Sequence, residues 1–172
     1  MIARLPRLAR QLPAFMLSWL MGGLIAASLT HSAYAQEPIA GRVIIMVASE
    51  KPGRVDPRLS AIPSLLAAFK KAPLNAYQSI EMEGQPTALR MRLKKAEEVE
   101  LPNGRKLRLE VEKINTDGTF LVSASLQRPG QNKYTLLLRV TEVPGKPFIV
   151  AGQPYKGGTL FIGVILGETK GS

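Results

Sequence analysis

The chain has 172 residues, no cysteine and one histidine, and it carries 23 lysines and arginines against 13 aspartates and glutamates. The histidine, His31, lies in the leader described below. The remaining chain therefore excludes Ser-His-Asp triads, Cys-His pairs and the ordinary His/Cys sites for zinc or copper. Carboxylate chemistry, Ser-Lys chemistry and oxygen-ligated metals stay open. No catalytic motif is evident, so we predict no catalytic, cofactor-binding or metal-binding residue, no cofactor, and a protein that is not an enzyme.

The first 35 residues have the features of a secretory signal peptide. Arg4, Arg7 and Arg10 form a positive start, and residues 15–29 form an uncharged, mainly apolar run of about 15 residues. A membrane-spanning helix needs roughly 20 apolar residues. Residues 33–35, Ala-Tyr-Ala, match the small-residue pattern that signal peptidase recognises, which predicts cleavage after Ala35. An uncleaved membrane anchor is the alternative.

Cleavage of this leader would leave residues 36–172, which we expect to be a periplasmic or secreted protein with no transmembrane segment. Its length is that of a single domain, which we expect to be β-rich. Three arginines leave with the leader, so 20 basic residues remain against 13 acidic ones, a net charge of +7.

The first elements of this domain are a strand and a helix. Residues 41–48, GRVIIMVA, form a short β-branched run that is typical of a buried strand. Asp56-Pro57 fits a helix N-cap followed by proline at the first helical position. Pro63 interrupts the apolar stripe that follows, which predicts one short turn and then a helix over residues 63–71. We expect the stripe to pack on the protein's own sheet, with a partner-binding anchor as the alternative. The stripe consists of Leu59, Ile62, Leu66 and Phe69.

From Tyr77 onward, apolar and polar residues alternate with the period of a β-strand. The pattern recurs at residues 89–94, 98–101, 107–112 and 120–126, and Tyr134, Leu136, Leu138 and Val140 continue it. Strands with one apolar face form antiparallel sheets with one solvated side. We therefore predict a mainly β fold, an antiparallel β-sandwich of about seven to nine short strands. One short helix near residues 63–71 crosses or caps a sheet, and a small closed β-barrel is the alternative.

The Pro-Asn-Gly sequence that ends at Gly104 predicts a hairpin register. A two-residue Asn-Gly turn would pair polar with apolar positions. A three-residue loop with a left-handed Gly104 sets Val99 opposite Leu107 and Glu98 opposite Arg108, so apolar meets apolar and acid meets base.

The next hairpin contains Asp117-Gly118, a typical two-residue type I′ turn. This turn sets Val111 opposite Ala124, which again matches the two faces.

Residues 152–159, GQPYKGGT, have the glycine spacing and final threonine of a phosphate-binding P-loop. A P-loop has lysine directly before that threonine and continues as a helix. Here Gly158 takes the lysine position, and residues 160–166 are β-branched. We therefore predict a hairpin that joins residues 148–151 to 160–166, with positive φ at the Gly157-Gly158 pair.

Glu98 and Glu100 share one face of a predicted strand at about 7 Å, a separation that suits a glycosidase. Their predicted cross-strand neighbours are Arg108 and Lys106, so we expect a solvated ladder of ion pairs. A carboxylate-dependent hydrolase is the alternative.

A basic stripe, Arg90, Arg92, Lys94 and Lys95, follows one predicted strand. Successive outward cations are able to bind an anionic polymer or lipid surface. Nucleic-acid binders also interleave exposed aromatic residues, and this strand has none, so nucleic acid is not expected as a partner. The alternative is that these charges keep the sheet soluble and prevent edge-to-edge pairing.

Together these patterns predict an exported, non-enzymatic binding or structural module of the bacterial envelope. Its expected partner is an anionic envelope surface or an envelope protein. An accessory subunit of an envelope assembly or secretion machine is the second interpretation.

Overall fold

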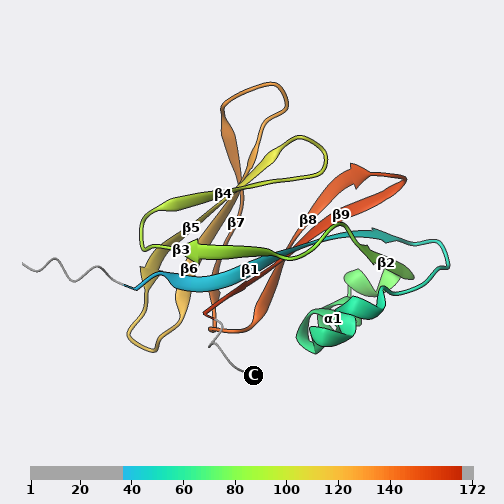
Figure 1. Cartoon of the computed structure of the whole chain (residues 1–172), viewed down its shortest axis with the longest axis horizontal. Helices are drawn as coiled ribbons and strands as arrows, with labels where there is room; N and C mark the ends of the chain where they lie inside the picture. The colour runs from blue at the N-terminus through green and yellow to red at the C-terminus, as the bar shows by residue number, and fades with distance from the viewer. Residues whose placement is uncertain (1–36, 168–172) are drawn as a thin grey trace, which may run out of the picture. The chain divides into compact units, whose positions relative to one another are not determined.

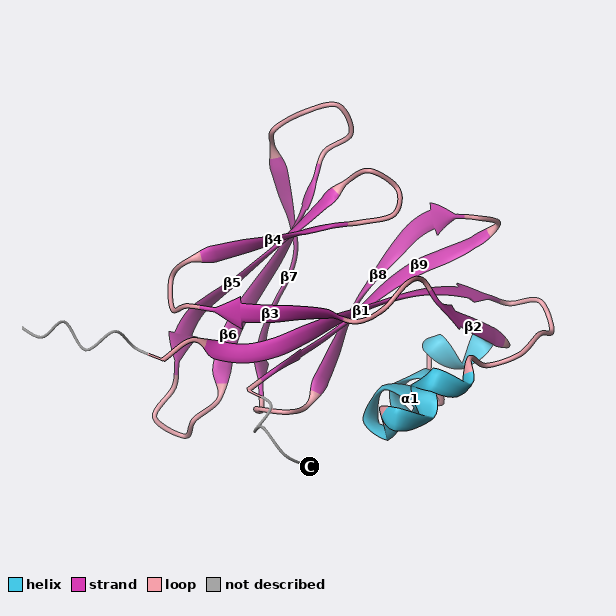
Figure 2. Ribbon diagram, in the orientation of Figure 1, coloured by secondary structure: helices cyan, strands magenta, loops and turns pink. Residues whose placement is uncertain are grey.

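The computed structural model describes residues 37–167. The predicted signal peptide, residues 1–35, and its cleavage site lie outside them, so export stays a prediction. The described residues form nine strands, one α-helix and two short 3₁₀ helices (Figure 2). In chain order these are β1 (Ile39–Ser49), η1 (Pro57–Ala61), α1 (Pro63–Phe69), η2 (Leu74–Ala76), β2 (Ser79–Met82), β3 (Thr87–Met91), β4 (Ala96–Glu100), β5 (Lys106–Ile114), β6 (Phe120–Gln127), β7 (Tyr134–Glu142), β8 (Pro147–Tyr155) and β9 (Gly158–Leu166).

The strands form two antiparallel sheets (Figure 1). One has four strands in the order β4-β5-β6-β7. In the other, β1 pairs with β9 along most of its length, and β9 pairs with β8. The opposite edge of β1 is shared by β3, beside residues 39–43, and β2, beside residues 46–49. Because the described strands form two separate sheets, the fold is the predicted β-sandwich and not a closed barrel.

The main hydrophobic core lies between the two sheets. Alternate residues of the four-stranded sheet point into it, which is why its strands show the period-two pattern of the sequence. Residues of β1, β8 and β9 face them from the other sheet. Its most deeply buried members include Val43, Leu107, Leu109, Val111, Val122, Leu160 and Val164.

A second core covers the other face of the five-stranded sheet. The helix α1 packs there, beside β2 (Figure 1). Asp56 caps η1, and Pro63 starts α1, so the predicted turn followed by a helix is confirmed. Pro63 also shifts the helical phase, because Leu65 is fully buried whereas Leu66 is only half-buried. Leu65 lies over Gly163 of β9, where a Cβ atom would come within 3.0 Å of the Leu65 Cδ1 atom.

The predicted hairpin between β4 and β5 is confirmed. Val99 lies opposite Leu107 and Glu98 opposite Arg108. The loop closes through a hydrogen bond from the Leu101 N–H to the Arg105 carbonyl oxygen, and Gly104 has a φ of +77°. An L-residue with a side chain is strained in this conformation, so the loop requires glycine.

The predicted register of the β5–β6 hairpin is wrong. Asn115 pairs with Thr119 across a three-residue loop instead of a two-residue turn. That loop alone would set Val111 opposite a serine. An extra residue, Glu112, forms a bulge that restores the match and places Val111 opposite Val122.

The strand β7 also departs from its predicted pattern. A register shift in its pairing with β6 leaves Leu137 as an extra residue and sets Leu136 opposite Ser125. Leu136 is 56% exposed and Leu137 is 42% exposed, so the series that placed Leu136 on the core face is wrong at this position.

Candidate functional site

The four predicted contact residues lie where β3 ends and β4 begins. Arg90 is on β3, but the strand stops at Met91, and Arg92, Lys94 and Lys95 form the connecting turn. Lys94 has a φ of 58°, and its N–H donates to the carbonyl oxygen of Val111 in the other sheet, at 2.8 Å. This hydrogen bond directs the chain from one sheet to the other. The prediction that all four residues follow one straight strand is therefore wrong, although they remain close in the chain. We call these four residues the basic corner.

Every side chain of the basic corner is exposed. Within residues 37–167 none of the four forms an ion pair or a side-chain hydrogen bond. An approaching anion would therefore not have to displace an acidic side chain from these cations. The corner has the properties of an electrostatic contact surface.

Glu98, three residues beyond the basic corner in the sequence, is engaged elsewhere. It accepts a hydrogen bond from the Tyr134 hydroxyl at 2.8 Å and forms ion pairs with Arg108 at 3.1 Å and Lys106 at 3.6 Å. The Arg108 guanidinium also lies over the Tyr134 ring, 4.3 Å from its centroid. The Tyr134 hydrogen bond, followed by the Arg108 and Lys106 contacts, lowers the pKa of Glu98. A general acid needs a raised pKa, so this environment suits an ion pair and not the general-acid role.

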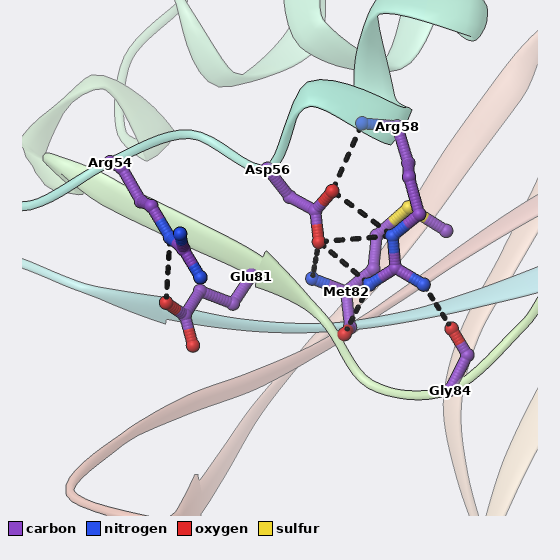
Figure 3. A network of polar contacts seen from close by, with 6 residues as sticks. All are labelled: Arg54, Asp56, Arg58, Glu81, Met82 and Gly84. Carbon is purple, nitrogen blue, oxygen red and sulfur yellow. Dashed lines mark hydrogen bonds and ion pairs between the residues drawn. The ribbon is translucent and has the colours of Figure 1, made fainter.

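Sequence reasoning found the cap at Asp56 but missed the clamp built on it (Figure 3). The Arg58 guanidinium binds the Asp56 carboxylate and also donates to the carbonyl oxygens of Met82, at 2.9 Å, and Gly84, at 2.8 Å. These hydrogen bonds hold the end of β2 against η1. The Arg58 hydrogen bonds keep the pKa of Asp56 well below its ordinary value. No local pattern reveals this cluster, because its partners are 24 and 26 residues apart in the chain.

The segment that resembles a P-loop forms the predicted hairpin, but its strands extend further than expected. β8 runs to Tyr155, and the two-residue turn is Lys156-Gly157, both with positive φ. Gly158 has no positive φ. A Cβ atom there would lie 2.6 Å from the Ala48 carbonyl oxygen, so the close approach of β1 explains this glycine. A strand, not a helix, follows Thr159, so the segment lacks the geometry that gives a P-loop its phosphate site.

Elsewhere, the described residues contain few groups arranged for catalysis or metal binding. Among them, no three Asp, Glu, His or Cys side chains gather as metal ligands do, and no helix has the length and apolarity to cross a membrane. Burial raises the pKa of Glu142. Comparisons of the chain with protein-family models, with curated proteins and with solved structures found no match.

Proposed function

We propose that the chain is a non-enzymatic module of the cell envelope that binds an anionic surface through the basic corner. One observation carries the proposal: four exposed cations lie within six consecutive residues, and none has an acidic partner in the described chain. The location in the envelope rests on the predicted signal peptide.

The energetics favour a lipid surface as the partner. Each basic side chain near an anionic bilayer contributes on the order of 1 kcal/mol, so four together suffice for reversible adsorption. The attraction extends over about one Debye length, roughly 10 Å at 0.1 M salt, and high salt abolishes it. Glu98, which would otherwise reduce the local positive charge, is already paired with Arg108 and Lys106.

Co-sedimentation with vesicles tests this proposal. The test variant changes all four residues of the basic corner to glutamine. A matched control changes four other exposed lysines, Lys51, Lys70, Lys71 and Lys113, to glutamine, and therefore removes the same charge. We expect the wild type and the control to bind phosphatidylglycerol vesicles at low salt, and the test variant to remain in the supernatant. Equal binding by the two variants, or no binding by the wild type, contradicts the proposal.

A second function, docking as a subunit of an envelope assembly, is favoured by the exposed leucines of β7. β7 is an edge strand of the four-stranded sheet, and Leu136 and Leu137 are about half exposed on it. An edge strand with exposed apolar side chains is able to accept a strand from a partner.

The absence of cysteine from the chain makes a docking test direct. A photo-crosslinker attached at Leu136→Cys should capture a discrete envelope protein, whereas the same probe at Ser60→Cys, an exposed position of η1, should not. Equal capture at both positions contradicts docking through β7.

A further inference from the structure

A pocket of about 340 Å³ lies between two hairpin loops of the four-stranded sheet. One loop ends at Gly104, between β4 and β5, and the other, residues 129–132, joins β6 to β7. No acidic residue lines the pocket. Its polar lining comes mainly from Arg105, Gln127, Arg128, Gln131 and Asn132. The pocket is at the opposite end of β4 from the basic corner, so the two surfaces are separate candidates.

The first arginine of this pocket, Arg105, is half-buried and held in place by uncharged acceptors. Its Nε donates to the Gln127 carbonyl oxygen at 2.7 Å, and its Nη1 donates to Gln153 Oε1 at 3.0 Å. Gln153 is 7% exposed, and the same oxygen accepts from Asn103 Nδ2 at 2.6 Å. Two of the five guanidinium N–H groups are used in this way. Arg105 has no ion pair in the described chain, so a partly desolvated charge faces the pocket without a counter-charge.

The second arginine, Arg128, is exposed, and one side-chain hydrogen bond holds its guanidinium. Its Nε donates to Thr135 Oγ1 at 2.9 Å. No other side-chain hydrogen bond or ion pair engages it within the described residues, so its terminal nitrogens remain available. Arg105 and Arg128 are 23 residues apart in the sequence, and only the pairing of β5 with β6 brings them to one pocket.

We propose that this pocket binds the phosphate or carboxylate group of a small soluble molecule between Arg105 and Arg128. The planar guanidinium group presents paired N–H donors that match the oxygens of both groups. The arrangement of Arg105 by Gln127 and Gln153 in the free protein reduces the entropy that binding would cost. The volume lies at the lower end of the range for small-molecule sites, roughly 300–1,000 Å³.

An NMR titration tests the proposal on the full chain after the cell has processed its leader. Inorganic phosphate and citrate are added separately, with sodium chloride at equal ionic strength as the reference. We expect saturable shifts of the Gly104 and Gly130 amide signals with one or both ligands, and the ligand that saturates identifies the group. Shifts that never saturate, or that chloride reproduces, overturn the proposal.

Three variants make the test specific. Arg128→Gln, a change at an exposed position, should weaken binding about tenfold, the effect of losing one charge-assisted hydrogen bond. Arg105→Lys keeps the charge but removes the planar fork, and should weaken binding similarly. Arg90→Gln removes an equal charge from the basic corner and should leave binding unchanged. If Arg128→Gln binds as the wild type does, or if Arg90→Gln weakens binding equally, the pocket is not the site.

Discussion

The two sheets differ in how many of their faces are covered. β1 and β9 bury both faces, one against the four-stranded sheet and one against α1. β4, β5 and β6 bury only one face. The outer face of the four-stranded sheet carries ion pairs such as Glu98–Arg108 and Glu112–Arg139. The two sheets therefore have different roles. The five-stranded sheet provides most of the buried hydrophobic residues. The four-stranded sheet carries ion pairs on its outer face and, at one end, the pocket lined by Arg105 and Arg128, which we call the arginine pocket.

This difference predicts where the free energy of unfolding is concentrated. Substitution of residues between α1 and the five-stranded sheet should lower the free energy of unfolding substantially, because burial and close packing both depend on these residues. Substitution of charged residues on the outer face of the four-stranded sheet should lower the free energy of unfolding only slightly, because exposed ion pairs contribute little to it. The following predictions test this contrast, beginning with the largest expected effect.

Leu65→Ala should lower the free energy of unfolding by about 3 kcal/mol. Leu65 is fully buried, and its removal leaves a cavity over Gly163 of β9. Urea denaturation measures the loss. Leu137→Ala, at a position that is 42% exposed on β7, is the control and should change stability by much less. If the two variants lose equal stability, α1 does not stabilise the sheet in the way the packing indicates.

Gly163→Val should destabilise by roughly 1–3 kcal/mol, because it overpacks the contact between β9 and α1. The new Cβ atom would approach both Leu65 Cδ atoms, at 3.0 and 3.2 Å. In a Leu65→Ala background the same change should cost much less, since the cavity accommodates valine. A double-mutant cycle measures this coupling. Additive effects of the two substitutions would contradict the direct contact.

Gly104→Val should destabilise by roughly 1 kcal/mol or more, through backbone strain alone. Nothing lies within 4 Å of a Cβ atom at this position, so no steric clash contributes. Gly104→Asn is the matched control, because asparagine tolerates positive φ better than valine does. An unchanged denaturation midpoint for Gly104→Val would mean that the loop does not hold Gly104 in the left-handed conformation.

The sequence predicts the features of this fold that depend on local periodicity and turn chemistry. The Val99–Leu107 register follows from matching faces, and the capped turn before α1 follows from Asp56 and two prolines. The bulge at Glu112 cannot be predicted from these patterns. A two-residue turn without a bulge and a three-residue loop with a bulge both place apolar residues opposite apolar residues. The end of β3 at Met91 depends on a hydrogen bond from Lys94 to Val111, which is distant in the chain.

The two candidate sites differ in the same way: one can be recognised from local sequence, and the other depends on tertiary contacts. The basic corner is a cluster of neighbours in sequence, so the sequence alone reveals it. The arginine pocket requires the correct pairing of β4, β5 and β6 and a buried Gln153 contributed by β8. No spacing rule connects residues 105, 128 and 153, and only the tertiary structure shows that they meet.

The smallest predicted effect concerns Glu98 on the outer face of the four-stranded sheet. Its pKa is lowered from an ordinary value of 4.5, chiefly by the Tyr134 hydroxyl. A carboxyl group with a lowered pKa in the folded state stabilises that state above its unfolded pKa. The contribution is lost as the pH falls through the folded pKa. Its side chain is 35% exposed, so solvent screening limits the contribution. About 0.5 kcal/mol at neutral pH is expected.

Glu98→Gln tests this by removing the charge while keeping an oxygen that accepts from Tyr134. The variant should be about 0.5 kcal/mol less stable than the wild type at pH 7, and the difference should shrink steadily below about pH 4.5. Glu100→Gln, two residues along the same exposed face, is the matched control because Glu100 forms no ion pair in the described chain. Urea denaturation of the three proteins between pH 7 and pH 3 measures the differences. If Glu100→Gln costs as much as Glu98→Gln, or if the Glu98 difference persists at low pH, the Tyr134–Glu98–Arg108 cluster contributes no charge-dependent stability. The outer face would then be a general solvated surface without specific ion pairs.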